Sequence, residues 1–417
     1  MLNSVKKPEL LAPGGDMEKL KTAVHFGADA VYVGGQRYGL RAGAKNFGGD
    51  ELAAGVRYAH ERGVKVYVTV NIFAHEEDFD GLAAYLKILE TLGADGILIS
   101  DPGVFALAKE AAPGLPLHIS TQANTTNARS AAFWRELGAR RVVLARELSL
   151  SEISTVSAGR PSGLELEVFV HGAMCMAYSG RCLLSHVLTG RDANRGECAQ
   201  PCRWNYHLSE AGRPGEYYPI GQDERGSYIL NSRDLCMIEH LPELLSAGAD
   251  ALKIEGRMKS SYYVAVTTRA YRRALDDCLA DPAGYAARLR EYAAEAAKAS
   301  HRRFSTGFYF GKPGPEGQDT DTAQYIRRHD FLAVVEGYDP NTGIALLEQR
   351  NKFAVGDEVE FMTPEGGFFQ TIVELWDGEG NAITAAPHPQ MKLRVKTAQP
   401  VRPLDVVRKE RADAALL

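Results

Sequence analysis

The sequence predicts an α/β protein built as a (β/α)₈ barrel of the TIM type, with a cysteine-rich insertion and a small C-terminal antiparallel β-barrel domain. Two observations predict the barrel. Short apolar runs alternate with helical stretches over roughly the first 280 residues, which is the usual size of this fold. Most runs are continuously apolar, as is typical of parallel strands buried on both faces. A doubly wound parallel sheet is the alternative architecture.

Eight apolar runs are the predicted barrel strands. Seven of them begin before Cys175, and the eighth follows a Leu-rich helical stretch. Most are followed by turn residues and then by a stretch in which apolar residues have helical spacing. The predicted strands lie at residues 9–13, 30–34, 65–71, 96–101, 117–122, 141–148, 164–173 and 251–256.

The predicted helices carry start and stop signals. Asp101-Pro102 fits an N-cap followed by proline at the first helical position. Ser149 and Glu152 have the spacing of a capping box. A Gly-Ala pair recurs just past four helical stretches, where glycine suits the left-handed conformation. These glycines are Gly27, Gly93, Gly138 and Gly248.

The domain boundaries follow from changes of pattern along the chain. Residues 1–303 are predicted to form the barrel, interrupted by the insertion at about 174–240 after the seventh strand. In a barrel, such an insertion lies at the C-terminal face, where these enzymes keep their chemistry. The composition of residues 304–330 predicts a linker. Short alternating runs separated by turn signals then predict the small β-barrel over 331–417.

Composition and charge exclude several classes of protein. Hydrophobic residues make up 45% of the chain and charged residues 24%, which excludes a disordered protein and a collagen. No apolar run reaches the roughly 18 residues of a transmembrane helix, and the first residues lack the apolar core of an export signal. We therefore expect a cytoplasmic protein with reduced cysteines and no membrane partner. The net charge of −5 excludes a coat for nucleic acid, although a local basic patch can still bind RNA.

Four of the six cysteines cluster within 28 residues of the predicted insertion. Their spacing is C-x6-C-x15-C-x3-C. Four thiolates on one loop-rich segment suit a structural zinc or an iron–sulfur cluster, and the spacing does not choose between these metals. Four unrelated buried thiols are the alternative. The candidate ligands are Cys175, Cys182, Cys198 and Cys202, with Cys236 as the reserve fourth ligand.

Polar residues at the carboxyl ends of the strands are the candidate catalytic and binding residues, because barrel enzymes keep their sites at that face. Glu255 ends an apolar strand, and a buried carboxylate is costly unless it is paired, so it has either a catalytic role or an arginine partner. His171 ends another apolar strand and is either a core histidine or a catalytic residue. The remaining candidates are Arg257 as a further catalytic residue and Asn71, Gln122 and Arg146 as substrate-binding residues.

A locally basic stretch is the candidate RNA-binding surface. Contacts from arginine to phosphate would give it that role. A solvated helix face is the alternative. The stretch comprises Arg269, Arg272, Arg273, Arg288, Arg290, Arg302, Arg303, Arg327 and Arg328.

The cysteine segment and several other segments resemble one protein family. Residues 167–185, with the sequence EVFVHGAMCMAYSGRCLLS, resemble the signature of the collagenase-like peptidases, family U32. The resemblance covers nearly the whole chain, including the small C-terminal domain. Further matching segments are 191–198, 202–204, 231–235, 252–257 and 351–357.

The resemblance implies a hydroxylase rather than a simple peptidase. Several branches of the family carry a 4Fe-4S cluster and hydroxylate their substrates without oxygen. This chain is most similar to the branch that makes 5-hydroxyuridine at the wobble position of tRNA and depends on prephenate. Other branches act on ribosomal RNA or on ubiquinone precursors. The resemblance implies that the cluster is held by Cys175, Cys182, Cys198 and Cys202.

The same resemblance implies partners for the chain. The expected partners are tRNA and prephenate, and a binding subunit that needs a paralogous family subunit for activity is a further hypothesis. Prephenate carries two carboxylates, and arginine suits their bidentate recognition. The arginines considered for this role are Arg41, Arg146, Arg181 and Arg257.

A peptidase of unassigned mechanism is the alternative function. Proteolysis needs an activated nucleophile or a metal-bound water. The sequence contains neither H-E-x-x-H nor G-x-S-x-G. A nucleophilic Cys175 would leave the other three clustered cysteines without a role, whereas a metal site uses all four. The residues therefore favour a redox or modification enzyme over a peptidase.

Overall fold

The computed structural model of the chain describes most of its residues. The described residues are 7–40, 45–175, 178, 182–191, 193, 196–204, 207–208, 218–219, 231–313, 317–319 and 325–411. The structural statements that follow concern these residues.

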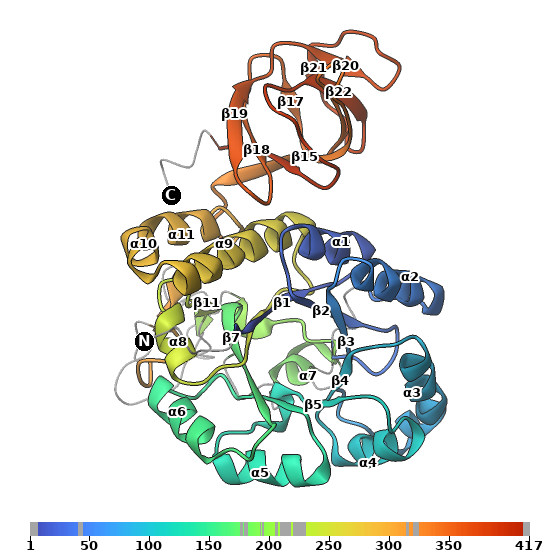
Figure 1. The fold of residues 1–417 in the computed structure, drawn as a ribbon, viewed down its shortest axis with the longest axis vertical. Coiled ribbons are helices and arrows are strands. Elements are labelled where there is room, and N and C mark those ends of the chain that lie inside the picture. The colour runs from blue at the N-terminus through green and yellow to red at the C-terminus, as the bar shows by residue number, and fades with distance from the viewer. Residues whose placement is uncertain are drawn as a thin grey trace.

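Eight parallel strands close into a barrel, as predicted (Figure 1). The last of them pairs with the first and with the seventh, which closes the sheet and excludes the doubly wound alternative. The strands are β1 (Glu9–Pro13), β2 (Ala30–Gly34), β3 (Lys65–Val70), β4 (Gly96–Ile99), β5 (Leu117–Ile119), β6 (Arg141–Val143), β7 (Glu165–Gly172) and β12 (Ala251–Ile254).

Helices surround the barrel, and their ends confirm the predicted signals. Asp101 accepts hydrogen bonds from the N–H groups of Gly103 and Val104, and Ser149 forms its capping box with Glu152. The four predicted glycines have φ between 76° and 112°. Within the described ranges, none of the helices has the length and apolarity needed to cross a membrane. The helices are α1 (Met17–His25), α2 (Gly49–His60), α3 (Leu82–Thr91), α4 (Pro102–Ala111), α5 (Ala128–Leu137), α6 (Leu150–Gly159), α8 (Leu241–Ser246) and α9 (Ser261–Ala280).

The insertion after β7 returns to the barrel through a short strand. It contains α7 (Leu184–Thr189) and a 3₁₀ turn at Pro201–Arg203. Strand β11 (Asp234–Cys236) then pairs antiparallel with the end of β7. Strand β13 (Phe304–Ser305) pairs with β11, so the beginning of the predicted linker joins the barrel sheet. Three further pieces are β8 (His207–Leu208), β9 (Tyr218–Pro219) and the β10–β14 pair, Asn231–Ser232 with Gln318–Asp319.

The C-terminal domain is an antiparallel sheet that curls into a partial barrel (Figure 1). Its strand order is β19-β18-β23-β15-β16-β22-β20, and its own apolar core lies inside the curve. The strands are β15 (His329–Asp339), β16 (Ile344–Gln349), β18 (Glu358–Met362), β19 (Gly367–Thr371), β20 (Leu375–Asp377), β22 (Lys392–Lys396) and β23 (Val406–Glu410), with a separate pair of β17 (Phe353–Ala354) and β21 (Ala385–Ala386).

Buried ion pairs join the two domains. Helices α10 (Pro282–Ala287) and α11 (Leu289–Ala296) follow α9, and the C-terminal domain lies against this end of the barrel (Figure 1). Arg408 is fully buried and donates to Glu360 Oε1 at 2.6 Å and to Glu295 Oε2 at 3.0 Å. Tyr262 stacks on Phe331 with ring centroids 5.4 Å apart. The junction therefore combines apolar packing with paired charges.

A layer of paired charges fills the amino-terminal half of the barrel. Arg141 is 3% exposed and its guanidinium bonds to Glu9 Oε1 at 2.7 Å, Glu165 Oε2 at 2.8 Å and Glu167 Oε2 at 3.1 Å. Glu167 also accepts a hydrogen bond from Lys253 Nζ at 2.7 Å. Charges are tolerated inside a protein where each has partners of opposite sign. This layer forms the base on which the polar residues at the carboxyl ends of the strands rest.

Candidate functional site

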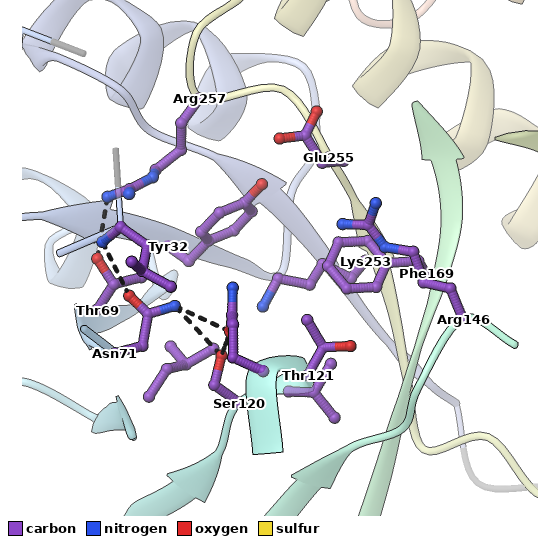
Figure 2. Close-up of a pocket in the computed structure, with 14 residues that line it drawn as sticks. Tyr32, Thr69, Asn71, Ser120, Thr121, Arg146, Phe169, Lys253, Glu255 and Arg257 are labelled. Carbon is purple, nitrogen blue, oxygen red and sulfur yellow. Dashed lines mark hydrogen bonds between the residues drawn. The ribbon is translucent and has the colours of Figure 1, made fainter. Parts of the chain in front are cut away.

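Two adjoining cavities lie at the carboxyl ends of the barrel strands. The inner cavity encloses about 50 Å³ and is lined from β2, β3, β4, β6, β7 and β12 and from the segments that follow strands (Figure 2). The outer cavity encloses about 420 Å³ and is lined largely by the insertion. Both are lined by Leu40, Gln122, Arg146 and Glu255, so the cavities share a boundary. This is the face that the sequence predicts for the site.

Two predicted binding residues form one hydrogen-bonded group in the inner cavity. Asn71 Nδ2 donates to Ser120 Oγ at 3.2 Å and to Gln122 Oε1 at 3.1 Å (Figure 2). The Leu40 N–H donates to Asn71 Oδ1 at 3.2 Å. Ser120 Oγ also donates to Gln122 Oε1. These bonds hold the Gln122 side chain by its Oε1. Its Nε2 has no hydrogen-bond acceptor within the described ranges and can donate to a ligand.

The third predicted binding residue, Arg146, lines both cavities. Its Nη1 donates to the Ala173 carbonyl oxygen at 2.7 Å, and its guanidinium lies 3.9 Å from the centre of the Phe169 ring. Its Nε is buried and has no hydrogen-bond partner in the described part of the chain. Because its contacts are to a neutral acceptor and a ring, its positive charge is available to an anion in either cavity.

Glu255 and Arg257 follow β12 and reach the inner cavity together (Figure 2). The backbone of Glu255 is fixed, because its N–H donates to the His171 carbonyl at 2.9 Å and its carbonyl accepts from Tyr263 Oη at 2.9 Å. Arg257 is buried and its Nη1 donates to Thr69 Oγ1 at 2.9 Å. It lies against Gly34, where any Cβ would collide with the guanidinium. Glycine at that position makes room for the arginine.

His171 is not brought together with Glu255 and Arg257 and lines neither cavity. Its imidazole is 1% exposed and packs against the rings of Tyr271, Tyr263 and Phe304. Burial lowers the pKa of His171 to about 3, so the ring is neutral at physiological pH. Its contribution to the site is the backbone carbonyl that holds Glu255.

The four predicted cysteine ligands line the outer cavity together. Cys175 follows β7, Cys182 precedes α7, Cys198 precedes the 3₁₀ turn, and Cys202 lies within that turn. Cys198 Sγ accepts a hydrogen bond from the Gln200 N–H at 3.4 Å. No three His, Cys, Asp or Glu side chains stand at metal-binding distance among the residues that the structure describes. Four thiols on one cavity have the donor chemistry of a thiolate-bound metal or cluster.

Cys236 is placed differently from these four cysteines. It lies on β11, outside the outer cavity, with its Sγ 3.8 Å from Tyr271 Oη. Burial raises the pKa of its thiol to about 11, which disfavours the thiolate. The structure therefore places Cys202, and not Cys236, on the same cavity as the other three predicted ligands.

Several cavity residues are absent from the sequence-based predictions. The most notable is Lys253, whose side chain faces the inner cavity from β12. Its position two residues before Glu255 on one strand was the signal that could have revealed it. The other polar and aromatic residues of the inner cavity that were not predicted are Tyr32, Thr69, Ser120, Thr121 and Phe169.

The remaining predicted arginines differ in position and in hydrogen-bond partners. Arg41 and Arg181 lie outside the described residues. In the basic stretch, several arginines are bound to carboxylates: Arg269 to Glu295, Arg272 to Asp29 and Asp276, and Arg288 to Asp277. These ion pairs leave less of the stretch available for phosphate than its sequence indicates.

The chain matches two protein-family models. Residues 15–319 match peptidase family U32, and residues 327–408 match the peptidase family U32 C-terminal domain. A tRNA hydroxylation protein of Bacillus subtilis is 44% identical over 97% of this chain and 95% of its own length. An uncharacterized protease of Methanocaldococcus jannaschii is 41% identical over 88% of this chain and 89% of its own length. A 23S rRNA 5-hydroxycytidine synthase of Escherichia coli is 37% identical over 66% of this chain and 40% of its own length.

Proposed function

The chain belongs to peptidase family U32, as its sequence indicates, and we propose that it hydroxylates RNA. The proposed substrate is the wobble uridine of tRNA, and the product is 5-hydroxyuridine. The names of relatives that hydroxylate tRNA and ribosomal RNA support an RNA substrate. The observation that carries the proposal is the meeting of four cysteines and the polar strand ends at adjoining cavities.

The cavities offer little support for proteolysis. A serine or cysteine peptidase needs a base beside its nucleophile. No histidine is among the described residues that line either cavity, and His171 is neutral and enclosed by aromatic rings. Peptide hydrolysis is therefore the second candidate, retained because a relative bears the name of a protease.

We propose that Cys175, Cys182, Cys198 and Cys202 hold a 4Fe-4S cluster. Four thiolates are a common ligand set for such a cluster, and these four thiols line one cavity. When bound there, the cluster supplies one-electron chemistry. The reactants are bound and oriented at the shared boundary of the two cavities. Gln122, Arg146 and Glu255 line both cavities there.

We propose prephenate as the co-substrate, held across the shared boundary so that it reaches from the larger outer cavity into the inner cavity. The ionisable lining of the inner cavity comprises three basic side chains and one carboxylate, Glu255. Glu167 compensates Lys253 from below, while Arg146 has a buried Nε without a partner in the described part of the chain and lines the cavity together with Arg257. Arginine recognises carboxylates with a planar pair of donors, so Arg146 and Arg257 match the two carboxylates of prephenate.

The amide groups of Asn71 and Gln122 are suited to a uracil edge. The free donor of Gln122 can meet a base carbonyl, while the hydrogen bonds to Ser120 and the Leu40 N–H hold both side chains in place. A base must leave its stack to reach such a recess. Trp204, two residues after Cys202 in the insertion, is exposed and can stack on such a base.

The direct test is the nucleoside composition of tRNA from a strain that lacks the gene. We expect 5-hydroxyuridine and its derivatives to be lost and to return when the wild-type gene is supplied. Cys175→Ala should not restore them, whereas Cys236→Ala should, because only the first thiol lines the outer cavity. Unchanged tRNA in the deletion strain would contradict the proposal. Activity in cells that the purified chain alone lacks would indicate a paralogous family subunit.

A further inference from the structure

Lys253 is a buried amine at the floor of the inner cavity. It lies on β12, two residues before Glu255, so that both side chains leave the chain on the same side. Its side chain is 4% exposed. Figure 2 shows its amine directed into the group of lining side chains rather than back toward its own strand. The proposed function gives this amine no role.

Glu167, the counter-ion of Lys253, has a second basic partner. The amine donates to Glu167 Oε1 at 2.7 Å, and the rings of Tyr32 and Phe169 lie 4.5 and 5.5 Å away. Glu167 also accepts a hydrogen bond from Arg141, which is bonded to two further carboxylates. A proton can therefore move from Lys253 to Glu167 without leaving either Glu167 or Arg141 unpartnered.

The surroundings of Lys253 favour the neutral amine more than the surroundings of an exposed lysine do. Burial lowers the pKa of Lys253; Glu167 opposes this shift, and the positive charges of Arg141 and Arg146 reinforce it. A neutral amine is a nucleophile, and buried lysines next to other cations are the ones that attack carbonyl groups. Arg146 and Arg257 remain charged in the same cavity and can hold a carboxylate.

We infer that Lys253 forms an imine with the ketone of a 2-oxo acid whose carboxylate is bound by the arginines of the inner cavity. The inference deepens the proposed function, because prephenate carries a 2-oxo acid side chain, and to that extent it rests on it. Capture of this kind would fix the co-substrate in one orientation and withdraw electrons from the carbons next to the former ketone.

The step balances without an oxidant or a reductant. Nζ attacks the ketone carbon, a carbon–nitrogen bond forms, and the carbon–oxygen bond then breaks. The ammonium form of Lys253 and the ketone give a protonated imine and one water. Of the three ammonium protons, one stays on nitrogen and two leave in the water. Glu167 Oε1, at 2.7 Å, is placed to take and return the proton during the attack.

The test is reductive trapping on the purified full chain. The protein is incubated with pyruvate, phenylpyruvate or prephenate and treated with sodium borohydride, which converts an imine into a stable secondary amine. Intact mass and peptide mapping then locate the adduct. We expect one adduct per chain, on Lys253, that requires both the 2-oxo acid and borohydride.

Two variants control the experiment. Lys253→Arg keeps a positive charge beside Glu167 but cannot form the imine, so its labelling should fall to the level seen without the 2-oxo acid. Lys87→Arg changes an exposed amine on α3 that lines neither cavity, and it should be labelled as the wild type is. If Lys253→Arg does not fold, peptide mapping of the wild type decides alone.

The outcomes separate this inference from the proposed function. Absence of an adduct with all three acids, or an adduct on another lysine, would overturn the inference whatever happens to tRNA. An adduct on Lys253 together with unchanged tRNA in the deletion strain would support the inference and contradict the tRNA substrate.

Discussion

The two ends of the barrel use buried charge in different ways. At the amino-terminal end, Arg141 is bonded to three carboxylates, and one of these also binds Lys253. At the carboxyl end, Arg146 bonds to a backbone carbonyl and lies over a ring, with no ion pair in the described part of the chain. A charge that is bound by its own protein stabilises the fold, whereas a charge left facing a cavity serves a ligand.

Lys253 stands at the boundary between these two ends. Its amine is tied to the paired layer through Glu167 and lines the cavity above it. The comparison therefore predicts that variants below this boundary lower stability and that variants above it lower ligand binding. The predictions below test this separation, beginning with the largest expected effect.

Glu167→Gln should lower the free energy of unfolding by about 3–5 kcal/mol, because it leaves the buried ammonium of Lys253 without its carboxylate partner. Urea denaturation followed by circular dichroism measures the change. Glu165→Gln is the matched control, and it should cost less because Glu165 is partly exposed. A loss of less than about 1 kcal/mol for Glu167→Gln, the value of an exposed pair, would show that the layer is not a stabilising unit.

Arg146→Met should weaken prephenate binding with little effect on stability. Loss of one hydrogen-bonded charge to a carboxylate costs about 2 kcal/mol, which is roughly thirtyfold in Kd. Isothermal titration calorimetry gives the affinity. Arg140→Met removes an exposed arginine at the other end of the barrel and should bind prephenate as the wild type does. Equal affinities for both variants would contradict the assignment of ligand binding to the carboxyl end of the barrel.

Acid should destabilise the protein through His171. Burial lowers the pKa of His171 to about 3 from an unfolded value near 6.5, so the unfolded chain binds more protons between these values. The contribution of His171 to the free energy of unfolding is therefore fully present above about pH 6.5. It falls as the pH drops toward 3, by up to about 1.4 kcal/mol per pH unit. Urea denaturation from pH 7 to pH 4 should show a shallower fall in His171→Gln. Parallel curves for the two proteins would refute this origin.

Asp101→Ala should have the smallest effect. It removes the N-cap of α4, which typically costs about 1 kcal/mol of stability. Asp101 lines neither cavity, so prephenate binding and tRNA hydroxylation should be unchanged. Thermal unfolding and nucleoside analysis measure the two properties. A loss of hydroxylation at unchanged stability would place Asp101 in the site.

Much of the fold could be predicted because its signals are local. Continuous apolar runs mark the eight strands, and the caps at Asp101 and Ser149 and the glycines after helices mark the helix ends. The short pairing of β11 with β13 could not be predicted, because two- and three-residue strands have no periodicity of their own. The partners of these strands are fixed by the position of β7 in the closed barrel.

The candidate site was predictable where side chains follow the regular alternation of a strand. Strand ends indicated Glu255, Arg257 and Gln122, and all three line the inner cavity. His171 shares the alternation of Glu167 and Phe169, which would direct it inward. The register between β7 and β12 shifts after Phe169, and His171 packs against aromatic rings instead. Sequence alone gives no sign of such an irregularity.

The measurement that tests the account most directly is the metal content of the protein purified without oxygen. Iron and acid-labile sulfide are assayed beside the visible absorption spectrum, for the wild type, Cys175→Ala and Cys236→Ala. The account predicts near-stoichiometric iron and sulfide in the wild type and in Cys236→Ala, and their loss in Cys175→Ala, because Cys175 lines the outer cavity and Cys236 does not. Zinc or no metal in the wild type would contradict the cluster and return the peptidase to first place.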